Sequence, residues 1–282
     1  MKYYQLDNDT KKYIKRLNYN GYKTPADIYS VDQFIRGLKD LGVYGNMIEA
    51  WFFRKNHNAG SGNIVYAFKD SFNSGTINNS STASWNDRGL ICTATSSSST
   101  SNYITCNLRP NSLSTVSLFS IFMSTPANME GFTSGFPYAS SLSTSIYGGT
   151  NSSSFSILSI GSNGQSWSSS LNNVNNPSII NGNSLFKIVK GSVSSTSVIS
   201  ESRDISKTLT SSSTSNTQGI LRYDRFIFNG RWNNGTVEAS NGSFGVGFHG
   251  THIFTCFFDI NVNFVSFETL FKNTIGNGID LP

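Results

Sequence analysis

The chain has 282 residues, of which only 13% are charged, and its formal net charge is +5. An average soluble protein carries about 25% charged residues, so polarity here comes mainly from Ser, Asn, Thr and Gly. The sparse basic residues do not form the dense basic face, interleaved with aromatics, that nucleic-acid binding requires. No apolar run reaches the roughly 18 residues of a membrane span, and the N-terminus lacks the apolar core of a secretory signal. We therefore expect a protein made in a cytoplasm, with no nucleic-acid partner and no membrane insertion.

The first 53 residues predict a helical N-terminal adaptor. Helix-start residues precede a helical spacing of apolar residues, and Gly21 supplies a stop. A second helix is expected to begin at Pro25 and to end at Gly42. Residues 43–53 are typical of a short helix that runs into an aromatic strand, in which Trp51 belongs to the core. The basic residues of the first helix form either a solvated face or a docking surface for an acidic partner.

From residue 54 the pattern changes to short β-type runs separated by Ser, Asn and Gly turns, which predicts an antiparallel sandwich over 54–282. Residues 159–170 and 187–198 are expected to form hairpins, the first with Asn163–Gly164 at its tip. A terminal helix at 264–275 should pack across the sandwich or beside the N-terminal helices. The expected strands lie at 63–68, 102–108, 114–123, 153–161, 184–191, 195–202, 220–230 and 244–258.

The cysteines and histidines do not predict a metal site. Cys92, Cys106 and Cys256 form no CxxC pair, and the odd number argues against an oxidised scaffold. Cys106 and Cys256 lie in apolar runs and are interpreted as small buried hydrophobic residues. The HxxH fragment at His249 and His252 lies in an expected strand, where the two rings would point to opposite faces. No cofactor is expected, and although Ca²⁺ is possible, no motif supports a site for it.

The acidic residues do not predict catalysis. A glycosidase needs two carboxylates that face one cleft, whereas the acids of the β-region are scattered singly. There is no GxSxG motif, and the histidines have no suitably spaced acids. We therefore expect no enzymatic activity and no catalytic residue. The scattered acids are Asp70, Asp87, Asp204, Asp224, Asp259, Glu201, Glu238 and Glu268.

Carbohydrate binding has candidate residues in the stretch FIFNGRWNNGT, residues 226–236. A tryptophan ring can stack on a sugar, while amide and guanidinium groups donate directional hydrogen bonds. The alternative is that Trp232 closes the end of the core from a rim loop and that the NNG sequence only makes a turn. Trp85, in SWNDRG, has the same two interpretations. The candidate sugar-binding residues are Trp232, Asn229, Arg231, Asn233, Asn234 and Trp167.

Tyrosines near the N-terminus could form an interface with copies of the chain or with another protein. Tyrosine offers a large amphipathic contact area at low entropy cost. The alternative is that these side chains pack against the sandwich. The interface candidates are Tyr3, Tyr4, Tyr13 and Tyr19, together with Tyr22 and Tyr29.

Several stretches occur in an order that resembles a family of bacteriophage virion proteins. They are QFIRGLKDLGVYGNMIEAWFF (33–53), VYAFKDSFNSGTINNSSTASWNDRGL (65–90), NYITCNLRPNSL (102–113), FIFNGRWNNGT (226–236) and FVSFETLFKNTIG (264–276). The family has a concanavalin A-like (laminin G-like) jelly-roll sandwich behind a short helical N-terminus. RKNHNAGSG, at 54–62, departs from the Pro/Gly-rich turn that is typical after the aromatic run.

This resemblance implies a mainly β protein with an antiparallel jelly-roll fold, located in a virus particle. We expect it to decorate the capsid or tail, to form homo-oligomers, and to contact other virion proteins and host surface glycans. The alternatives are a purely structural capsid or tail component with no ligand and, because the fold also hosts such enzymes, a glycan hydrolase.

Overall fold

The computed structural model describes the two ends of the chain and the strands between them. The described residues are 5–17, 25–58, 62–80, 83–92, 102–108, 115–124, 134–135, 145–148, 154–160, 166–172, 185–194, 197–203, 209–215, 227–228, 231–233, 236–238 and 250–277. The fold is mainly β, with antiparallel sheets and short helices, as the sequence predicts.

In the described parts of the chain, three α-helices lie near its two ends: α1 (Asn8–Arg16), α2 (Pro25–Asp40) and α3 (Phe264–Asn273). The side chain of Asp7 caps α1 by accepting a hydrogen bond from the backbone N–H of Asp9. Gly42 follows α2 with a φ of +71°, a conformation that favours glycine. The helix α1 ends at Arg16, before the expected stop at Gly21. No helix among the described residues is long and apolar enough to cross a membrane.

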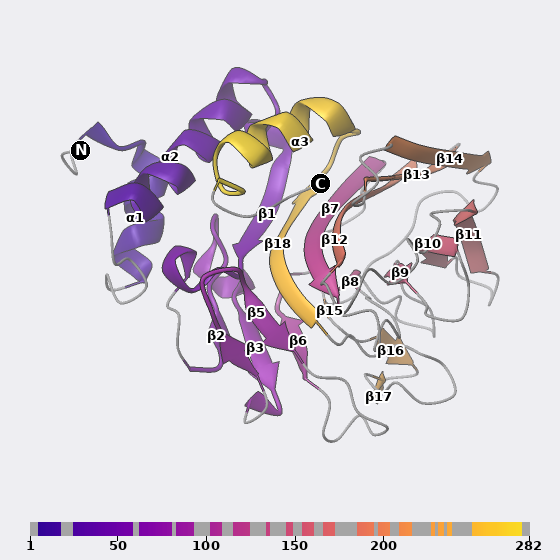
Figure 1. Ribbon diagram of the computed structural model, residues 1–282, viewed down its shortest axis with the longest axis horizontal. Coiled ribbons are helices and arrows are strands. Elements are labelled where there is room, and N and C mark those ends of the chain that lie inside the picture. The colour runs from indigo at the N-terminus through magenta and orange to yellow at the C-terminus, as the bar shows by residue number, and fades with distance from the viewer. Residues whose placement is uncertain are drawn as a thin grey trace.

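The largest sheet is antiparallel and has eight strands. Along it lie β14 (Leu209–Ser215), β13 (Ser197–Arg203), β12 (Leu185–Ser194), β7 (Thr115–Ser124), β18 (Gly250–Phe258), β5 (Leu90–Cys92) and β4 (Ser84–Trp85). The eighth strand, β1 (Met47–Phe52), pairs with β18 outside this order. Figure 1 shows that β18, β7 and β12 curve strongly, with the helices on the outer side of the curve and the three-stranded sheet on the inner side.

The smaller sheets occupy different places in Figure 1. A five-stranded sheet has the order β2 (Ile64–Val65), β3 (Gly75–Asn78), β6 (Tyr103–Cys106), β15 (Ile227–Phe228) and β8 (Ser134–Gly135). A three-stranded sheet contains β11 (Ser166–Asn172), β10 (Ser154–Ile160) and β9 (Ser145–Gly148). The last is a two-stranded ladder of β16 (Arg231–Asn233) and β17 (Thr236–Glu238). Strands β9, β10 and β11 lie on the inner side of the curve of the large sheet, whereas β2 and β3 lie below the helices in Figure 1.

Both hairpins predicted from the sequence are confirmed. Strands β10 and β11 pair from Ser154↔Asn172 to Ile160↔Ser166, which leaves residues 161–165 to connect them. Strands β12 and β13 pair up to Val193↔Val198. The expected tip at Asn163–Gly164 lies outside the described residues.

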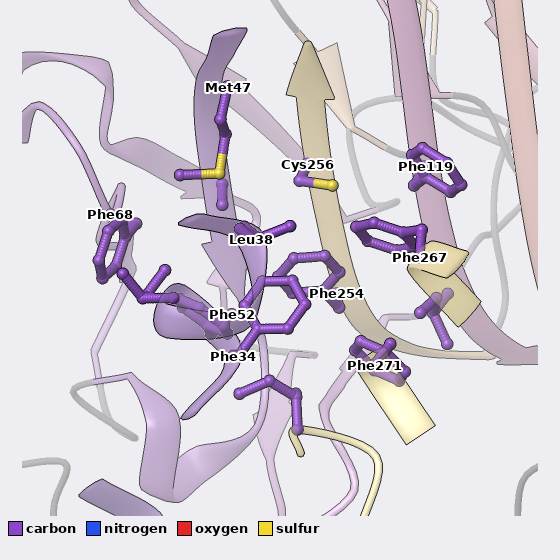
Figure 2. Packing of buried hydrophobic residues seen from close by; sticks show 14 of the residues in the cluster. Phe34, Leu38, Met47, Phe52, Phe68, Phe119, Phe254, Cys256, Phe267 and Phe271 are labelled. Atoms are coloured by element: carbon purple, nitrogen blue, oxygen red, sulfur yellow. The ribbon is translucent and has the colours of Figure 1, made fainter. Parts of the chain in front are cut away.

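The helices and the large sheet share one hydrophobic core, which Figure 2 shows from close by. Phe34 of α2 lies at its centre, with ring centroids 5.2 Å from Phe254 of β18 and 6.2 Å from Phe52 of β1. Phe267 and Phe271 of α3 contact the same ring at 5.9 and 6.3 Å. These edge-to-face contacts are the arrangement that aromatic rings prefer. The terminal helix therefore packs beside the N-terminal helices and across the large sheet.

The shared core extends across the division expected at residue 53. Strand β1 belongs to the large sheet, where Trp51 pairs with Thr255 and Phe52 with Phe254. The N-terminal helices thus form one folded unit with the sandwich. The sequence pattern changes at this point because the secondary structure changes, whereas the core continues across it.

A second group of aromatic side chains fills the space between the large sheet and the five-stranded sheet. Phe228 of β15 contacts Trp51 and Phe53 edge to face, with ring centroids 5.0 and 5.2 Å apart. His252 of β18 stacks on Phe53 at 3.9 Å. Trp51 is fully buried, which confirms its predicted place in the core.

Candidate functional site

The stretch around Trp232 forms a strand rather than the expected rim loop. Trp232 pairs with Val237, and Arg231 and Asn233 flank it in the same short strand. The two-stranded ladder formed by β16 and β17 lies on the opposite side of the molecule from the helices (Figure 1). Asn229 and Asn234 lie outside the described residues. Of the candidate set, the structure therefore brings together Arg231, Trp232 and Asn233.

Trp167 belongs to a different hairpin. It lies in β11, opposite Ser159 of β10, in the three-stranded sheet. Trp232 and Trp167 are thus placed on separate sheets, and the candidate sugar-binding residues do not form one strand or one turn.

Trp85 begins a tight turn between β4 and β5. Its indole N–H donates to the carbonyl of Gly62, and the side chain is half-buried. The Asn86 side chain accepts hydrogen bonds from the backbone N–H groups of Arg88 and Gly89, at 2.9 and 2.8 Å. This Asn-centred turn agrees with the expected turn at this position.

Tyr13 is part of the core, which corrects its assignment to an interface. Its side chain is fully buried, its hydroxyl donates to the carbonyl of His57 at 2.8 Å, and its ring packs on Phe52 and Phe68. Burial raises the pKa of this hydroxyl above its usual range. A side chain with no exposed surface offers no contact area to another molecule. Tyr3, Tyr4, Tyr19 and Tyr22 lie outside the described residues, whereas Tyr29 is 46% exposed on α2.

The described histidines lie within the protein interior. The ring of His252 is buried and its Nε2 lies 2.8 Å from the Thr255 hydroxyl, while burial holds its pKa well below the usual value. Burial and the nearby Arg54 charge lower the pKa of His57 to about 3. Within the described ranges, no three His, Cys, Asp or Glu side chains gather as they would around a metal ion. His249 lies outside those ranges.

Cys92, Cys106 and Cys256 are all buried, as expected for Cys106 and Cys256. Burial raises the pKa of both of these thiols well above its usual range. The thiolate is the reactive form of cysteine, so these positions are structural.

Two of the acids form ion pairs on the helix side of the large sheet. Glu201 contacts Lys190 at 2.6 Å, and Glu268 of α3 contacts Arg203 of β13 at 2.5 Å. Glu268 also contacts Lys272 at 2.9 Å. These carboxylates link strands β12 and β13 and join the sheet to α3. Asp204 and Asp224 lie outside the described residues.

A buried acid in β1 was not predicted from the sequence. Glu49 is fully buried, and its carboxylate accepts hydrogen bonds from the backbone N–H groups of Ala50 (3.0 Å), Lys69 (2.6 Å) and Asp70 (3.1 Å). The side-chain amide of Asn73 donates to it at 3.0 Å. Desolvation raises the pKa of this carboxyl, although the hydrogen bonds oppose the shift. A charged residue inside the apolar run MIEAWF was the available indication.

A second missed feature is the outward face of the five-stranded sheet, formed by Ile64, Thr76, Asn78, Tyr103 and Thr105. Thr76 pairs with Ile64 on one side and with Thr105 on the other, so these residues share a face of the sheet. The Asn78 amide donates to the Thr105 hydroxyl at 3.3 Å. Ile64 and Thr76 are exposed, and Tyr103 is half-buried. The face offers hydroxyl, amide and aromatic groups and carries no charge.

No protein-family model matches the chain, and no curated protein matches it in sequence. Among solved structures, a binding domain of botulinum neurotoxin serotype D is similar over 82% of this chain and 53% of its own, with a TM-score of 0.51 and 10% identity. A serotype G binding domain is similar over 80% and 50%, with a TM-score of 0.50 and 13% identity. Tailspike protein 2 from Escherichia coli O157:H7 bacteriophage CAB120 covers 58% of this chain at a TM-score of only 0.38, with 12% identity and 22% of its own length.

The chain spans about half the length of the neurotoxin domains that it matches. At these identities the likeness concerns the fold, and it agrees with the antiparallel sheets packed face to face in Figure 1. The chain therefore has a β-sandwich fold of the kind found in these binding domains.

Proposed function

We propose that the chain is a non-enzymatic component of a bacteriophage particle that is displayed on the capsid or tail and contacts host surface glycans. The observation that carries this proposal is the position of the two-stranded ladder of β16 and β17, which includes Trp232. The ladder lies on the opposite side of the molecule from the helices (Figure 1). We assign attachment to the helical end of the molecule and sugar contact to the end that carries β16 and β17.

The chemistry of the described surface supports a carbohydrate ligand. The outward face of the five-stranded sheet offers hydroxyl and amide groups beside the half-buried Tyr103. Sugar hydroxyls form directional hydrogen bonds with such groups, and their C–H faces pack on aromatic rings. The sandwich of the similar neurotoxin structures belongs to domains that are described as binding domains, which agrees with a recognition role.

Binding by such a surface is weak for one copy and strong for many. A neutral polar surface with few aromatic groups gains little free energy per contact, because water competes for each hydrogen bond. Many copies on one particle raise the local concentration of binding sites, which increases avidity without any new contact. We therefore expect homo-oligomers and neighbouring virion proteins as partners.

A purely structural role is the second candidate, and the burial of Tyr13 favours it. A tyrosine that was a candidate for an external contact can instead stabilise the core, as Tyr13 does. In that case the sandwich would only extend the particle surface.

The first experiment measures binding of the purified protein to a glycan array and to intact host-type cells, in both monomeric and streptavidin-tetramerised form. Trp232→Ala and Trp167→Ala are the test variants, with folding checked by circular dichroism. Specific binding that one folded variant loses would support a receptor-binding role and locate the site. If even the tetramer binds nothing, the glycan proposal fails and the structural role remains.

The particle role needs a separate measurement. Mass spectrometry of density-purified phage particles should detect the chain at a fixed ratio to the major capsid protein. Its absence from such particles would contradict the virion assignment.

A further inference from the structure

A short turn beside the five-stranded sheet displays an aromatic side chain to solvent. The Phe72 turn consists of residues 69–73 and contains the 3₁₀ turn η4 (Ser71–Asn73). Phe72 is 68% exposed, which makes it the most exposed large hydrophobic side chain among the described residues. Phe68, four positions earlier, is 1% exposed and packs on Tyr13 and Phe52. The same segment therefore buries one phenylalanine and exposes the other.

The buried side chain of Glu49 stabilises the Phe72 turn through hydrogen bonds. Its carboxylate accepts the backbone N–H groups of Lys69 and Asp70 and the side-chain amide of Asn73. A fully buried carboxylate is costly to desolvate, and it is tolerated where several donors converge on it. Removing it would leave those donors without their acceptor, so the conformation of the turn depends on Glu49.

Further hydrogen bonds fix the two ends of the turn. The indole N–H of Trp51 donates to the carbonyl of Asn73 at 3.2 Å, and the Asp70 carboxylate accepts the N–H of Phe72 at 2.9 Å. Upstream, the guanidinium of Arg16 donates to the carbonyls of Ala67, Phe68 and Lys69. The backbone that carries Phe72 is therefore set in place before any partner arrives.

A rigid backbone under an exposed aromatic ring favours recognition. Ordering a loop during binding costs free energy, and a preformed loop avoids that cost. Aromatic side chains with few rotatable bonds act as contact anchors in many binding surfaces for the same reason.

The groups around Phe72 indicate the chemistry of its partner. Lys69 does not supply a surface charge, because its ammonium group donates to the carbonyls of Tyr44 and Met47. Ser71 is an exposed hydroxyl beside the ring, and Asp70 is an exposed acid. The turn leads directly into β3, which places Thr76 and Asn78 on the outward face of the sheet. Hydroxyl, amide and aromatic groups match a sugar, while the acid repels sialylated glycans and anionic lipid surfaces.

We propose that the Phe72 turn and the adjoining outward face of the five-stranded sheet form a binding site for a neutral glycan, with the Phe72 ring packing on the C–H face of a sugar. This inference rests on the proposed glycan-binding function and assigns it to a site apart from Trp232 and Trp167. Glu49 is the positioning residue of the site, and Ser71 and Thr76 supply hydroxyl groups to the sugar.

The test compares the tetramerised wild type with Phe72→Ala on an array of neutral and sialylated glycans. Tyr29→Ala is the matched control, because Tyr29 is an exposed aromatic residue on α2, away from the turn. We expect Phe72→Ala to weaken binding of neutral glycans about tenfold, as the loss of one aromatic packing contact predicts. Phe72→Trp should retain binding, and the melting temperature of all three variants should stay close to that of the wild type.

Each outcome separates this site from the proposed function. If the wild type binds a glycan and Phe72→Ala binds it equally well, the Phe72 site is wrong while the glycan function stands. Loss of binding in Trp232→Ala alone would have the same meaning, and a preference for sialylated glycans would overturn the assignment to neutral sugars. If the wild type binds no glycan in tetrameric form, both the function and this site are refuted.

Discussion

The imidazole Nε2 of His57 lies 2.9 Å from the hydroxyl oxygen of Ser30, which joins the turn after β1 to helix α2. The Ser30 hydroxyl donates its proton to the carbonyl of Asp27, so His57 Nε2 carries the hydrogen in their contact. Nδ1 is buried without a hydrogen-bond partner among the described residues. A proton added there would be desolvated and close to Arg54, which explains why the pKa of His57 is lowered to about 3.

This pKa predicts that acid destabilises the protein. Between pH 6.5 and about 3 the unfolded chain binds a proton at His57 that the folded chain does not, so the free energy of unfolding falls as the pH is lowered. Because of His57, the free energy of unfolding should be about 2 kcal/mol lower at pH 5 than at pH 8. Urea unfolding of the wild type and of His57→Gln at both pH values tests this, because the variant should lose less stability on acidification. An equal loss in the two proteins would show that His57 does not cause the dependence. Glu49, whose pKa is raised, has the opposite sign and is present in both proteins.

Adding a single methyl group at Gly89 should strongly lower the free energy of unfolding. A Cβ atom at this position would lie 2.1 Å from the carbonyl oxygen of His252, which is backbone in the middle of the large sheet and cannot move aside. We expect Gly89→Ala to lower the free energy of unfolding by about 1–3 kcal/mol. Gly45→Ala is the control, because a Cβ there meets nothing within 4 Å. Chemical denaturation of both variants measures the difference, and a Gly89→Ala protein as stable as the control would contradict this close approach.

The ion pair between Arg203 and Glu268 predicts that α3 depends on strand β13. Glu268→Gln removes the charge that faces both Arg203 and Lys272, and leaves two cations close together. Because Arg203 and Lys272 are partly exposed, we expect a loss of about 2 kcal/mol, which is less than a fully buried pair would cost. Lys12→Met is the control, because it removes only the exposed partner of the Lys12–Asp9 ion pair, whose atoms lie 3.4 Å apart. Asp9→Asn is less suitable, because Asp9 also pairs with Lys39.

Thermal denaturation should show a clear shift for Glu268→Gln and almost none for Lys12→Met. A double-mutant cycle with Arg203→Met then isolates the coupling between the two residues. A coupling energy near zero would mean that the contact adds nothing to the attachment of α3.

The elements of the fold were largely predictable because local patterns determine them. Pro25 at the first position of α2, Gly42 after it and the alternating strands of β12 and β13 all follow from rules of backbone geometry. The register of the sheets and the shared core were not predictable in this way. Phe34 contacts Phe254 and Phe271, which lie more than 200 positions away, and no local pattern encodes such a pairing.

The candidate site was harder to predict for a related reason. Arg231–Asn233 was expected to lie in a rim loop because Asn and Gly surround the tryptophan, yet these residues form strand β16. Glu49 and Phe72 were not predicted as functional residues because each lies in an environment that is unusual for its type. Acids are usually exposed and phenylalanines are usually buried. An acid is buried, and a phenylalanine is exposed. Only the tertiary structure reveals that the first holds the turn that displays the second.

The shared core also predicts that the sandwich cannot fold without the N-terminal helices. A chain that starts at Arg54 lacks β1, which pairs with β18 over five positions, and it lacks Phe34 and Leu38 from the core. Losing one such phenylalanine typically costs about 3–5 kcal/mol, and a domain of this size is stable by only about 5–15 kcal/mol. We expect the truncated chain to show no cooperative thermal transition by circular dichroism and to aggregate, since the large sheet would expose its apolar face. Adding residues 1–53 as a separate peptide should partly restore the transition. A truncated chain that melts cooperatively on its own would show that the N-terminal helices are a separate adaptor.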